Sequence, residues 1–198
     1  MRTARPLAVV GLYLAALALP ARAQPAPAWD LGTLMRSLAQ VHSAAATFTE
    51  TKTLAMLKTP LQTSGKLRYV APDYVRKTVL APTPQDFVLQ KGVVTLTADG
   101  RTRQFDLSQA PPLAGLVEGV RASLAGDLPT LERYYVIELS GGAARWQLLL
   151  RPRDAELSRF LSWLSIGGSG NRITEIDTGG AHGDLTRMSV DETIDNAP

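Results

Sequence analysis

The residues that could carry catalytic or metal chemistry are few and lie far apart. The chain contains two histidines, His42 and His182, and no cysteine. The histidines lack a ligand-like spacing such as HxxxH, so they make a weak case for a zinc site. His42 follows a candidate helix, where an imidazole most often contacts the last carbonyl groups, and His182 lies in a glycine-rich turn. Both are therefore interpreted as solvated surface residues.

Two further patterns match functional motifs only in part. Gly167 to Gly170 reads GGSG, without the Gly-Lys-Ser/Thr ending and following helix of a phosphate loop. A Ser-His-Asp triad assembles in space and leaves no fixed order in a sequence, but the Gly-x-Ser-x-Gly elbow is missing. Asp127 and Asp184 each follow a glycine, which turn chemistry explains. We expect no enzyme, no metal and no cofactor, and a secreted hydrolase is the less favoured alternative.

The N-terminus has the organisation of a secretory signal peptide. Arg2 and Arg5 precede an apolar run from Leu7 to Leu19, and Ala21-Arg22-Ala23 is a small-residue cleavage site. The run is shorter than the roughly 20 residues that a membrane span needs. A retained anchor is the alternative. The pattern predicts a signal peptide at 1–23, a single domain at 24–198 and a periplasmic location.

Removal of this segment changes the charge of the chain. It takes away three of the 21 basic residues and none of the 18 acidic ones, which leaves a formal net charge of zero. A neutral domain offers no electrostatic argument for nucleic-acid binding. The absence of cysteine from the sequence excludes disulfides and a lipidated N-terminal cysteine. We expect a soluble monomer.

The elements that must position any site are mostly strands. Thr-, Val- and aromatic-rich segments alternate with period two, and Asp99-Gly100 is a strong hairpin signal. The predicted strands are 47–53, 61–70, 74–80, 85–90, 93–97, 101–107, 135–139, 144–150, 172–177 and 185–190, followed by an acidic, loose tail from Asp191.

Apolar residues at helical spacing predict helices at 31–41, 113–124 and 129–134. The segment 157–166 is ambiguous, because its spacing favours a helix while Phe160, Leu164 and Ile166 also share a strand face. Gly115 and Gly119 lower the helix propensity of 113–124 by roughly 1 kcal/mol each, so this helix depends on docking.

The fold class that follows is mainly β (α+β). About ten strands joined by tight turns exceed what a flat sheet carries, so the sheet curls and the helices cover its apolar inner face. Period two alone does not say which set of side chains faces inward, since a one-residue slip inverts every assignment.

The order of several short motifs resembles that of the outer-membrane lipoprotein carrier (LolA-like) family. The resemblance implies an incomplete β-barrel with a helical lid over an apolar cavity, and it places a strand in the ambiguous 157–166 segment. It also implies a periplasmic carrier that takes acylated lipoproteins from an inner-membrane ABC-type extraction complex to an outer-membrane receptor. The matching residues are Phe48, Glu50 and Lys52, then Gly65, Leu67 and Tyr69, Ala71-Pro72-Asp73 with Lys77, Gly126-Asp127-Leu128, and Trp146, Leu148, Leu150 and Pro152.

A cavity lined by aromatic and aliphatic side chains binds acyl chains through the hydrophobic effect, about 0.8 kcal/mol per buried methylene. The lipid-binding residues that we expect are Phe48, Leu67, Tyr69, Phe87, Leu89, Leu113, Leu116, Val117, Val120, Trp146 and Leu148.

One position departs from the family pattern. Ala71 stands where the carriers typically have a basic residue that helps to hold the lid closed. We therefore expect a different lid latch, or none. The departure also keeps open a second hypothesis, a carrier or sensor for another lipid such as a glycolipid or an acylated pigment.

Overall fold

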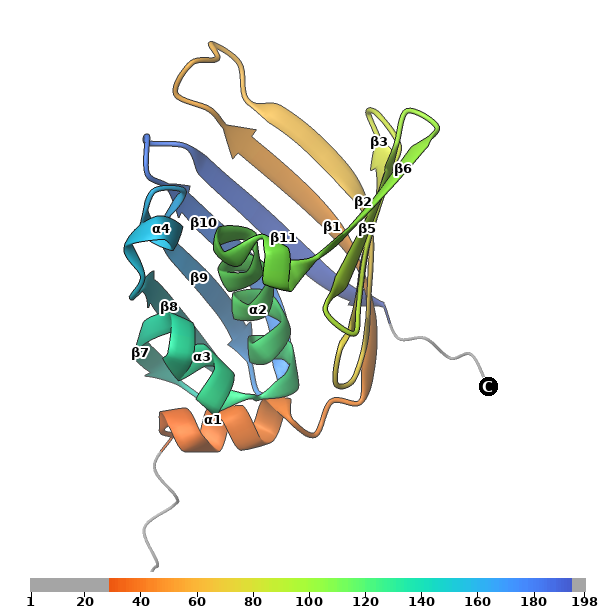
Figure 1. Cartoon of the computed structure of the whole chain (residues 1–198). Helices are drawn as coiled ribbons and strands as arrows, with labels where there is room; N and C mark the ends of the chain where they lie inside the picture. Colours follow the sequence, from red (N-terminus) through yellow and green to blue (C-terminus); the bar gives the residue numbers. More distant parts are fainter. Residues whose placement is uncertain (1–28, 194–198) are drawn as a thin grey trace, which may run out of the picture.

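The computed structural model describes residues 29–193 and forms one curled antiparallel sheet with helices on its concave side (Figure 1). The predicted signal peptide lies outside the described residues. Within residues 29–193, no helix combines the length and hydropathy that crossing a membrane requires. The strands are β1 (Ser43–Thr53), β2 (Leu61–Val70), β3 (Tyr74–Ala81), β4 (Gln85–Gln90), β5 (Val93–Ala98), β6 (Arg101–Asp106), β7 (Tyr135–Gly142), β8 (Arg145–Pro152), β9 (Leu161–Ser169), β10 (Arg172–Gly180) and β11 (Leu185–Thr193).

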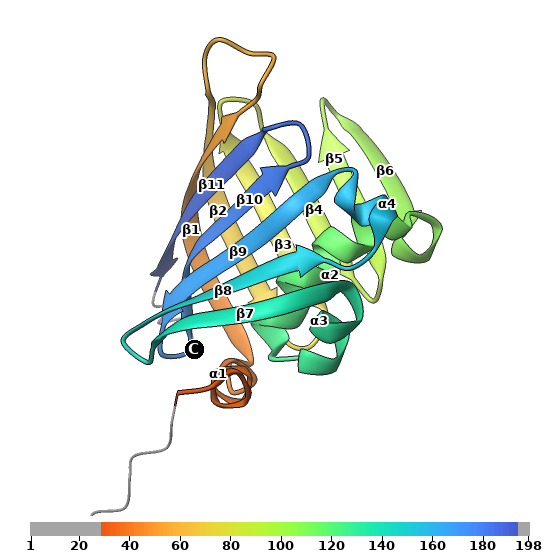
Figure 2. The ribbon, with the colours of Figure 1, turned by 90° about the vertical axis from the view of Figure 1, so that its left-hand side faces the viewer.

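The eleven strands follow the order β6-β5-β4-β3-β2-β1-β11-β10-β9-β8-β7. All neighbours are antiparallel, and the β1–β11 pair joins the two ends of the chain at the centre of the sheet. β6 and β7 are the edges, so the barrel is incomplete. Figure 2 shows how the sheet bends between these two edges. The predicted fold class is confirmed.

The turns and caps follow local chemistry. Asp99 and Gly100 both have positive φ, 51° and 71°, as a two-residue hairpin turn of the primed type requires. Asp30 accepts a 2.7 Å hydrogen bond from the Thr33 backbone and caps the first helix. The helices are α1 (Leu31–Leu38), the 3-10 turn η1 (Leu107–Gln109), α2 (Pro111–Ala125), α3 (Leu128–Tyr134) and α4 (Ala155–Ser158).

Several predicted boundaries differ from the structure. The strand that the resemblance places in the ambiguous segment is confirmed as β9, but it begins only at Leu161, after the short helix α4 and the exposed Phe160. Gly167 and Gly168 belong to β9, so only Gly170 of the GGSG segment lies in the β9–β10 turn. Asp191 is not the start of a loose tail, because β11 continues to Thr193 and pairs with β1.

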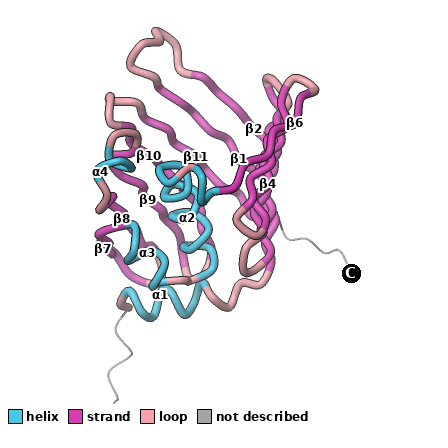
Figure 3. Tube along the Cα trace, in the orientation of Figure 1, coloured by secondary structure: helices cyan, strands magenta, loops and turns pink. Residues whose placement is uncertain are grey.

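The helices divide the concave face into two regions (Figure 3). α1, α2 and α3 pack on β7, β8 and β9 around a core that includes Leu34, Leu131 and Leu164. Two smaller clusters lie around Phe48 and around Leu89. Between the large core and the β1–β4 part of the sheet, the concave face is not filled by side chains, and this space is the cavity described next.

Candidate functional site

A cavity of about 400 Å³ lies between α2 and the concave face of the sheet. Its wall comes from β1, β2, β3, β4, β10 and β11, with α1 and α2 contributing the remainder. In Figure 1, α1 crosses one end of the sheet, whereas the β1–β2 connection extends beyond the opposite end. The volume is within the usual range of small-ligand sites, roughly 300–1,000 Å³.

Eight of the eleven predicted lipid-binding residues line this cavity. Leu67 and Tyr69 share one face of β2, and Phe87 and Leu89 share one face of β4. The structure therefore shows which strand parity faces inward, which periodicity alone left open. The eight are Leu67, Tyr69, Phe87, Leu89, Leu113, Leu116, Val117 and Val120.

The other three predicted residues lie outside the cavity wall. Trp146 and Leu148 belong to the large core, where α1, α2 and α3 cover β8. The Trp146 indole donates a 2.9 Å hydrogen bond to the Gly170 carbonyl, so its N–H group joins β8 to the β9–β10 turn. Phe48 is only 2% exposed and packs among Ala46 and Val79.

Sequence reasoning missed the C-terminal part of the wall. Ile176, Met188 and Val190 line the cavity from β10 and β11. Met188 and Val190 alternate with polar residues in the predicted 185–190 strand, so the signal was present. It was overlooked because nothing in the sequence places this strand beside β1.

A partly buried ion pair lies in the mainly apolar wall of the cavity. The Glu50 carboxylate, 8% exposed, accepts hydrogen bonds from Lys77 Nζ at 2.6 Å and from the Thr63 hydroxyl at 3.3 Å. The Lys77 ammonium also lies 4.8 Å from the centroid of the Phe48 ring, a cation–π distance. Both charges are thus neutralised locally, as a low-dielectric site requires.

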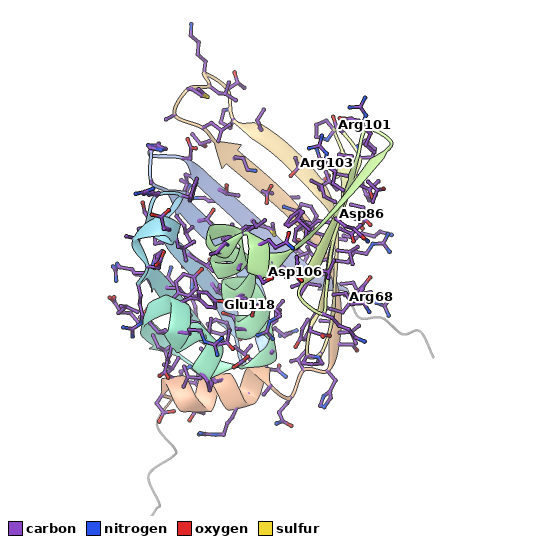
Figure 4. The ribbon with its side chains drawn as sticks, in the orientation of Figure 1. Arg68, Asp86, Arg101, Arg103, Asp106 and Glu118 are labelled. Carbon is purple, nitrogen blue, oxygen red and sulfur yellow. The ribbon has the colours of Figure 1, made fainter. Side chains whose placement is uncertain are left out.

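The outer face of the same strands carries separate charges. Arg76 and Asp86 form an ion pair of 2.8 Å, and Figure 4 shows Asp86 on the side of the sheet that faces away from α2. Burial raises the pKa of Asp86, but the hydrogen bonds from Arg76 and Thr78 outweigh burial and lower it. These groups solvate the convex surface and do not reach the cavity.

α2 has two different faces. Its large side chains, among them Leu116 and Val120, line the cavity. Its small residues face the core: a Cβ on Gly115 would lie 2.5 Å from a Leu157 methyl, and one on Gly119 would lie 2.8 Å from the Tyr135 hydroxyl. The glycines that we expected to weaken this helix thus permit its close approach to α4, β7 and β9.

Arg121 joins α2 to the β2–β3 turn. Its guanidinium donates to the Pro72 carbonyl at 3.1 Å and pairs with Glu118 at 2.7 Å and Asp127 at 2.9 Å. Figure 4 shows Glu118 on α2. The cation next to this turn therefore comes from the helix, whereas the family pattern places it beside the proline, where this chain has Ala71.

The weaker chemical candidates are not brought together. His42 Nδ1 lies 2.8 Å from the carbonyl of Gln40, as expected for an imidazole after a helix. Asp127 accepts from the Thr130 backbone within its own turn, whereas Asp184 accepts from the Ala55 backbone and joins the β10–β11 turn to the β1–β2 connection, so both carboxylates stabilise the fold. Among residues 29–193, no group of three or more His, Asp or Glu side chains is placed to hold a metal ion.

Comparison with solved structures finds distant likenesses. A LolA superfamily protein from Nitrosomonas europaea is 10% identical, with 83% of this chain and 93% of that chain covered at a TM-score of 0.45. A DUF1329 family protein from Desulfovibrio piger is 10% identical, with 85% and 92% covered at a TM-score of 0.47. A chain of the Pseudomonas aeruginosa MucA/MucB complex is 15% identical, with 85% and 58% covered at a TM-score of 0.45.

Comparison of sequences assigns the family. No curated protein matches the chain. The sequence model of a family described as outer membrane lipoprotein carrier protein LolA-like matches residues 23–197. That span includes every described strand and helix, and the predicted resemblance is thereby confirmed: the chain belongs to the LolA-like family of outer membrane lipoprotein carrier proteins.

Proposed function

We propose that residues 24–198 form a periplasmic carrier that binds acyl chains in the cavity beneath α2. The observation that carries this proposal is the cavity itself, whose wall is mainly apolar and is built from both the sheet and the helices. A filled core would leave no such volume, because protein interiors are normally close-packed. The proposal involves no bond making or breaking.

The cavity supplies enough hydrophobic free energy for this role. The cavity, at about 400 Å³, is within the size range of small-ligand sites. At about 0.8 kcal/mol for each buried methylene, burial of about ten methylenes of an acyl chain contributes about 8 kcal/mol before the entropic costs of binding.

The route belongs to the same proposal. The carrier takes acylated lipoproteins from an inner-membrane ABC-type extraction complex and delivers them to an outer-membrane receptor. Direction along the route comes from differences in affinity between its successive members. The sequence-predicted signal peptide at 1–23 accounts for the periplasmic location.

A second candidate, a carrier for a lipid other than a lipoprotein, rests on two observations. The cavity volume, about 400 Å³, lies near the lower end of the range for small-ligand sites, roughly 300–1,000 Å³, whereas a lipoprotein carries more than one acyl chain. The position that is basic in lipoprotein carriers is Ala71. Both observations favour a smaller cargo unless the cavity widens on binding.

Native mass spectrometry of the protein, purified gently from its own periplasm, tests the proposal. A discrete adduct that yields acyl chains on solvent extraction supports a carrier, with a lipopeptide favouring lipoproteins and a free lipid favouring the second candidate. A protein that leaves the periplasm without an adduct and takes up no added lipid would overturn both.

Rescue of a strain depleted of its lipoprotein carrier separates the two candidates further. Growth restored by this chain supports lipoprotein transport. Failure to restore growth by a protein that is exported and folded favours the second candidate.

A further inference from the structure

Three polar residues form a row across the concave face of the sheet. Thr178 on β10 is opposite Thr186 on β11, and Thr186 is opposite Lys52 on β1. All three residues line the cavity. Residues in register on adjacent antiparallel strands have Cβ atoms about 5 Å apart, so the two threonine side chains and the stem of Lys52 are neighbours, and the flexible Lys52 ammonium is within reach of the hydroxyls.

The row lies at one end of the cavity. Lys52 is the last residue but one of β1, Thr186 is the second residue of β11, and Thr178 is two residues from the end of β10. This is the end of the sheet from which the β1–β2 connection extends, opposite the end that α1 crosses (Figure 1). An amphiphile with its tail beneath α2 would bring its head group to this row.

The charge of the row is positive. The Lys52 ammonium has no carboxylate within ion-pair distance among residues 29–193. The nearest inward-facing acid along the strand, Glu50, is already paired with Lys77 and Thr63. One uncompensated cation beside two half-buried hydroxyls is suited to an anionic oxygen group.

Other cations in the cavity wall are less suited to this role. Arg121 is neutralised by Glu118 and Asp127. Arg172 begins β10, six residues before Thr178 and therefore roughly 20 Å along the strand. That separation is comparable with the length of one extended acyl chain, so the two ends of the cavity are chemically distinct.

We propose that the Thr178–Thr186–Lys52 row binds the carboxylate or phosphate head group of a single-chain amphiphile whose tail occupies the cavity. This inference rests on the second candidate, a carrier for a lipid other than a lipoprotein, and narrows its cargo to an anionic lipid with one acyl chain. The hydroxyls donate hydrogen bonds to the anionic oxygens, and the Lys52 ammonium supplies the opposite charge.

The test compares three probes with the same tail: laurate, lauryl phosphate and uncharged lauryl alcohol, titrated into the mature protein at neutral pH. Binding of laurate or lauryl phosphate about tenfold tighter than that of the alcohol is expected, because a charge-assisted hydrogen bond adds about that factor. Preference for laurate or for lauryl phosphate identifies the anion. Equal binding of all three, or a preference for the alcohol, would overturn the head-group site and leave the carrier proposal intact. Binding of none would overturn both.

Lys52→Met removes the charge while keeping much of the aliphatic stem, and Thr186→Val removes one hydroxyl without changing the shape of the side chain. Each is expected to weaken binding of the anionic probes, Lys52→Met by about tenfold, while leaving binding of the alcohol unchanged. Arg187→Met is the matched control, since Arg187 follows Thr186 on β11 but is exposed and does not line the cavity. An equal loss for Arg187→Met, or a loss only for Arg172→Met, would contradict the assignment.

Discussion

At the scale of single residues, Arg121 is the contact that holds the C-terminal half of α2 against the sheet. It is 13% exposed, and three of its nitrogens have partners on three different segments. A guanidinium can do this because its planar fork presents several donors in fixed directions. It therefore places a cation beside the β2–β3 turn that contains Ala71.

We expect Arg121→Ala to lower the free energy of unfolding by about 1–2 kcal/mol, because Glu118 and Asp127 lose their shared partner at a partly buried position. We also expect faster uptake of a fluorescent fatty acid, since α2 loses its bond to Pro72. Urea unfolding and stopped-flow fluorescence measure the two effects. For Arg121→Lys, both the free energy of unfolding and the uptake rate should lie between those of the parent protein and of Arg121→Ala. An unchanged uptake rate in both variants would show that Arg121 does not hold α2 in place.

Asp127 gives the same contact a pH dependence. Burial raises the pKa of Asp127, but hydrogen bonds from Thr130 and Arg121 outweigh burial and hold the pKa below its ordinary value. A lowered pKa in the folded state contributes stability above the unfolded value of about 3.9, and that stability is lost as the pH falls through the folded value.

Arg121→Ala should therefore lose less stability than the parent protein when the pH is lowered from 7 to below about 4. Thermal unfolding at a series of pH values measures the difference. Parallel pH profiles for the two proteins would contradict the coupling.

Two buried tyrosine hydroxyls differ in their hydrogen bonding, so the substitution of tyrosine by phenylalanine should have opposite effects at the two positions. The Tyr69 hydroxyl is buried in the cavity wall without a hydrogen-bond partner among the described residues, whereas the Tyr135 hydroxyl donates to the Gly115 carbonyl at 2.7 Å. Burial raises the pKa of both phenols, so both remain protonated at neutral pH.

Tyr69→Phe should raise the free energy of unfolding by about 1 kcal/mol, because it removes an unsatisfied polar group. Tyr135→Phe should lower it by about the same amount, because it removes a buried hydrogen bond. Chemical denaturation measures the free energy of unfolding of both variants. A loss of stability in Tyr69→Phe would show that the Tyr69 hydroxyl of the parent protein has a hydrogen-bond partner in solution.

At the scale of elements, α2 is positioned by its small residues. Ala122 is fully buried and Ser123 bonds back to the Gly119 carbonyl at 2.7 Å, which continues the close-packed face begun by the two glycines. This face fixes the helix on β7 and β9. The opposite face of α2, which carries the larger side chains, therefore lies over the cavity and lines it.

Gly119→Ala should destabilise the protein by about 1 kcal/mol although alanine favours helices, because its Cβ would lie 2.8 Å from Tyr135 and 2.9 Å from Leu164. Gly32→Ala in α1 is the matched control. There the nearest atom is the flexible end of Arg36 at 3.2 Å, and we expect a gain of under about 1 kcal/mol. Thermal unfolding compares the stabilities of the two variants. A gain of stability in Gly119→Ala would mean that α2 does not pack this closely against Tyr135 and Leu164.

At the scale of the whole molecule, the incomplete barrel separates a folding core from a cavity. The large core joins α1, α2 and α3 to β7, β8 and β9, while the cavity wall is mainly β1–β4, β10 and β11. A substitution in the wall can therefore abolish binding without unfolding the chain, whereas one in the core cannot.

Leu116→Asp introduces a charge into the cavity and should reduce acyl-chain binding more than tenfold with the fold retained. Val136→Asp is the control, because Val136 is 44% exposed on the edge strand β7 and does not line the cavity. Fatty-acid titration and circular dichroism report binding and fold. Full binding by a folded Leu116→Asp protein would remove the cavity from the proposed function. Phe48→Asp, by contrast, should unfold the protein, since Phe48 is 2% exposed.

Much of this organisation is local, and the sequence predicts it. The strands follow from period-two alternation, the β5–β6 hairpin from Asp99-Gly100, and the start of α1 from the Asp30 cap. Each of these depends only on residues within a few positions. Strand ends were less accurate, because pairing with a distant strand extends β11 through the acidic residues Asp191 and Glu192.

The cavity shows where local reasoning stops. Leu67 and Tyr69, which share the apolar face of a predicted strand, line the cavity, whereas Trp146 and Leu148, selected on the same ground, lie under helices. All four residues have the same period-two apolar pattern. Whether such a side chain lines a space or fills a core depends on where α1, α2 and α3 dock, which is a long-range property.

The sequence by itself determined the family, the mainly β class, most of the strands and helices and eight residues of the apolar wall, because periodicity and turn chemistry act over short distances. Only the tertiary structure decided which parity faces inward, that Arg121 reaches Pro72, and that Lys52, Thr186 and Thr178 form one row. These last relations join residues far apart in the chain. They exist only after β1 and β11 have paired and the sheet has curled around α2.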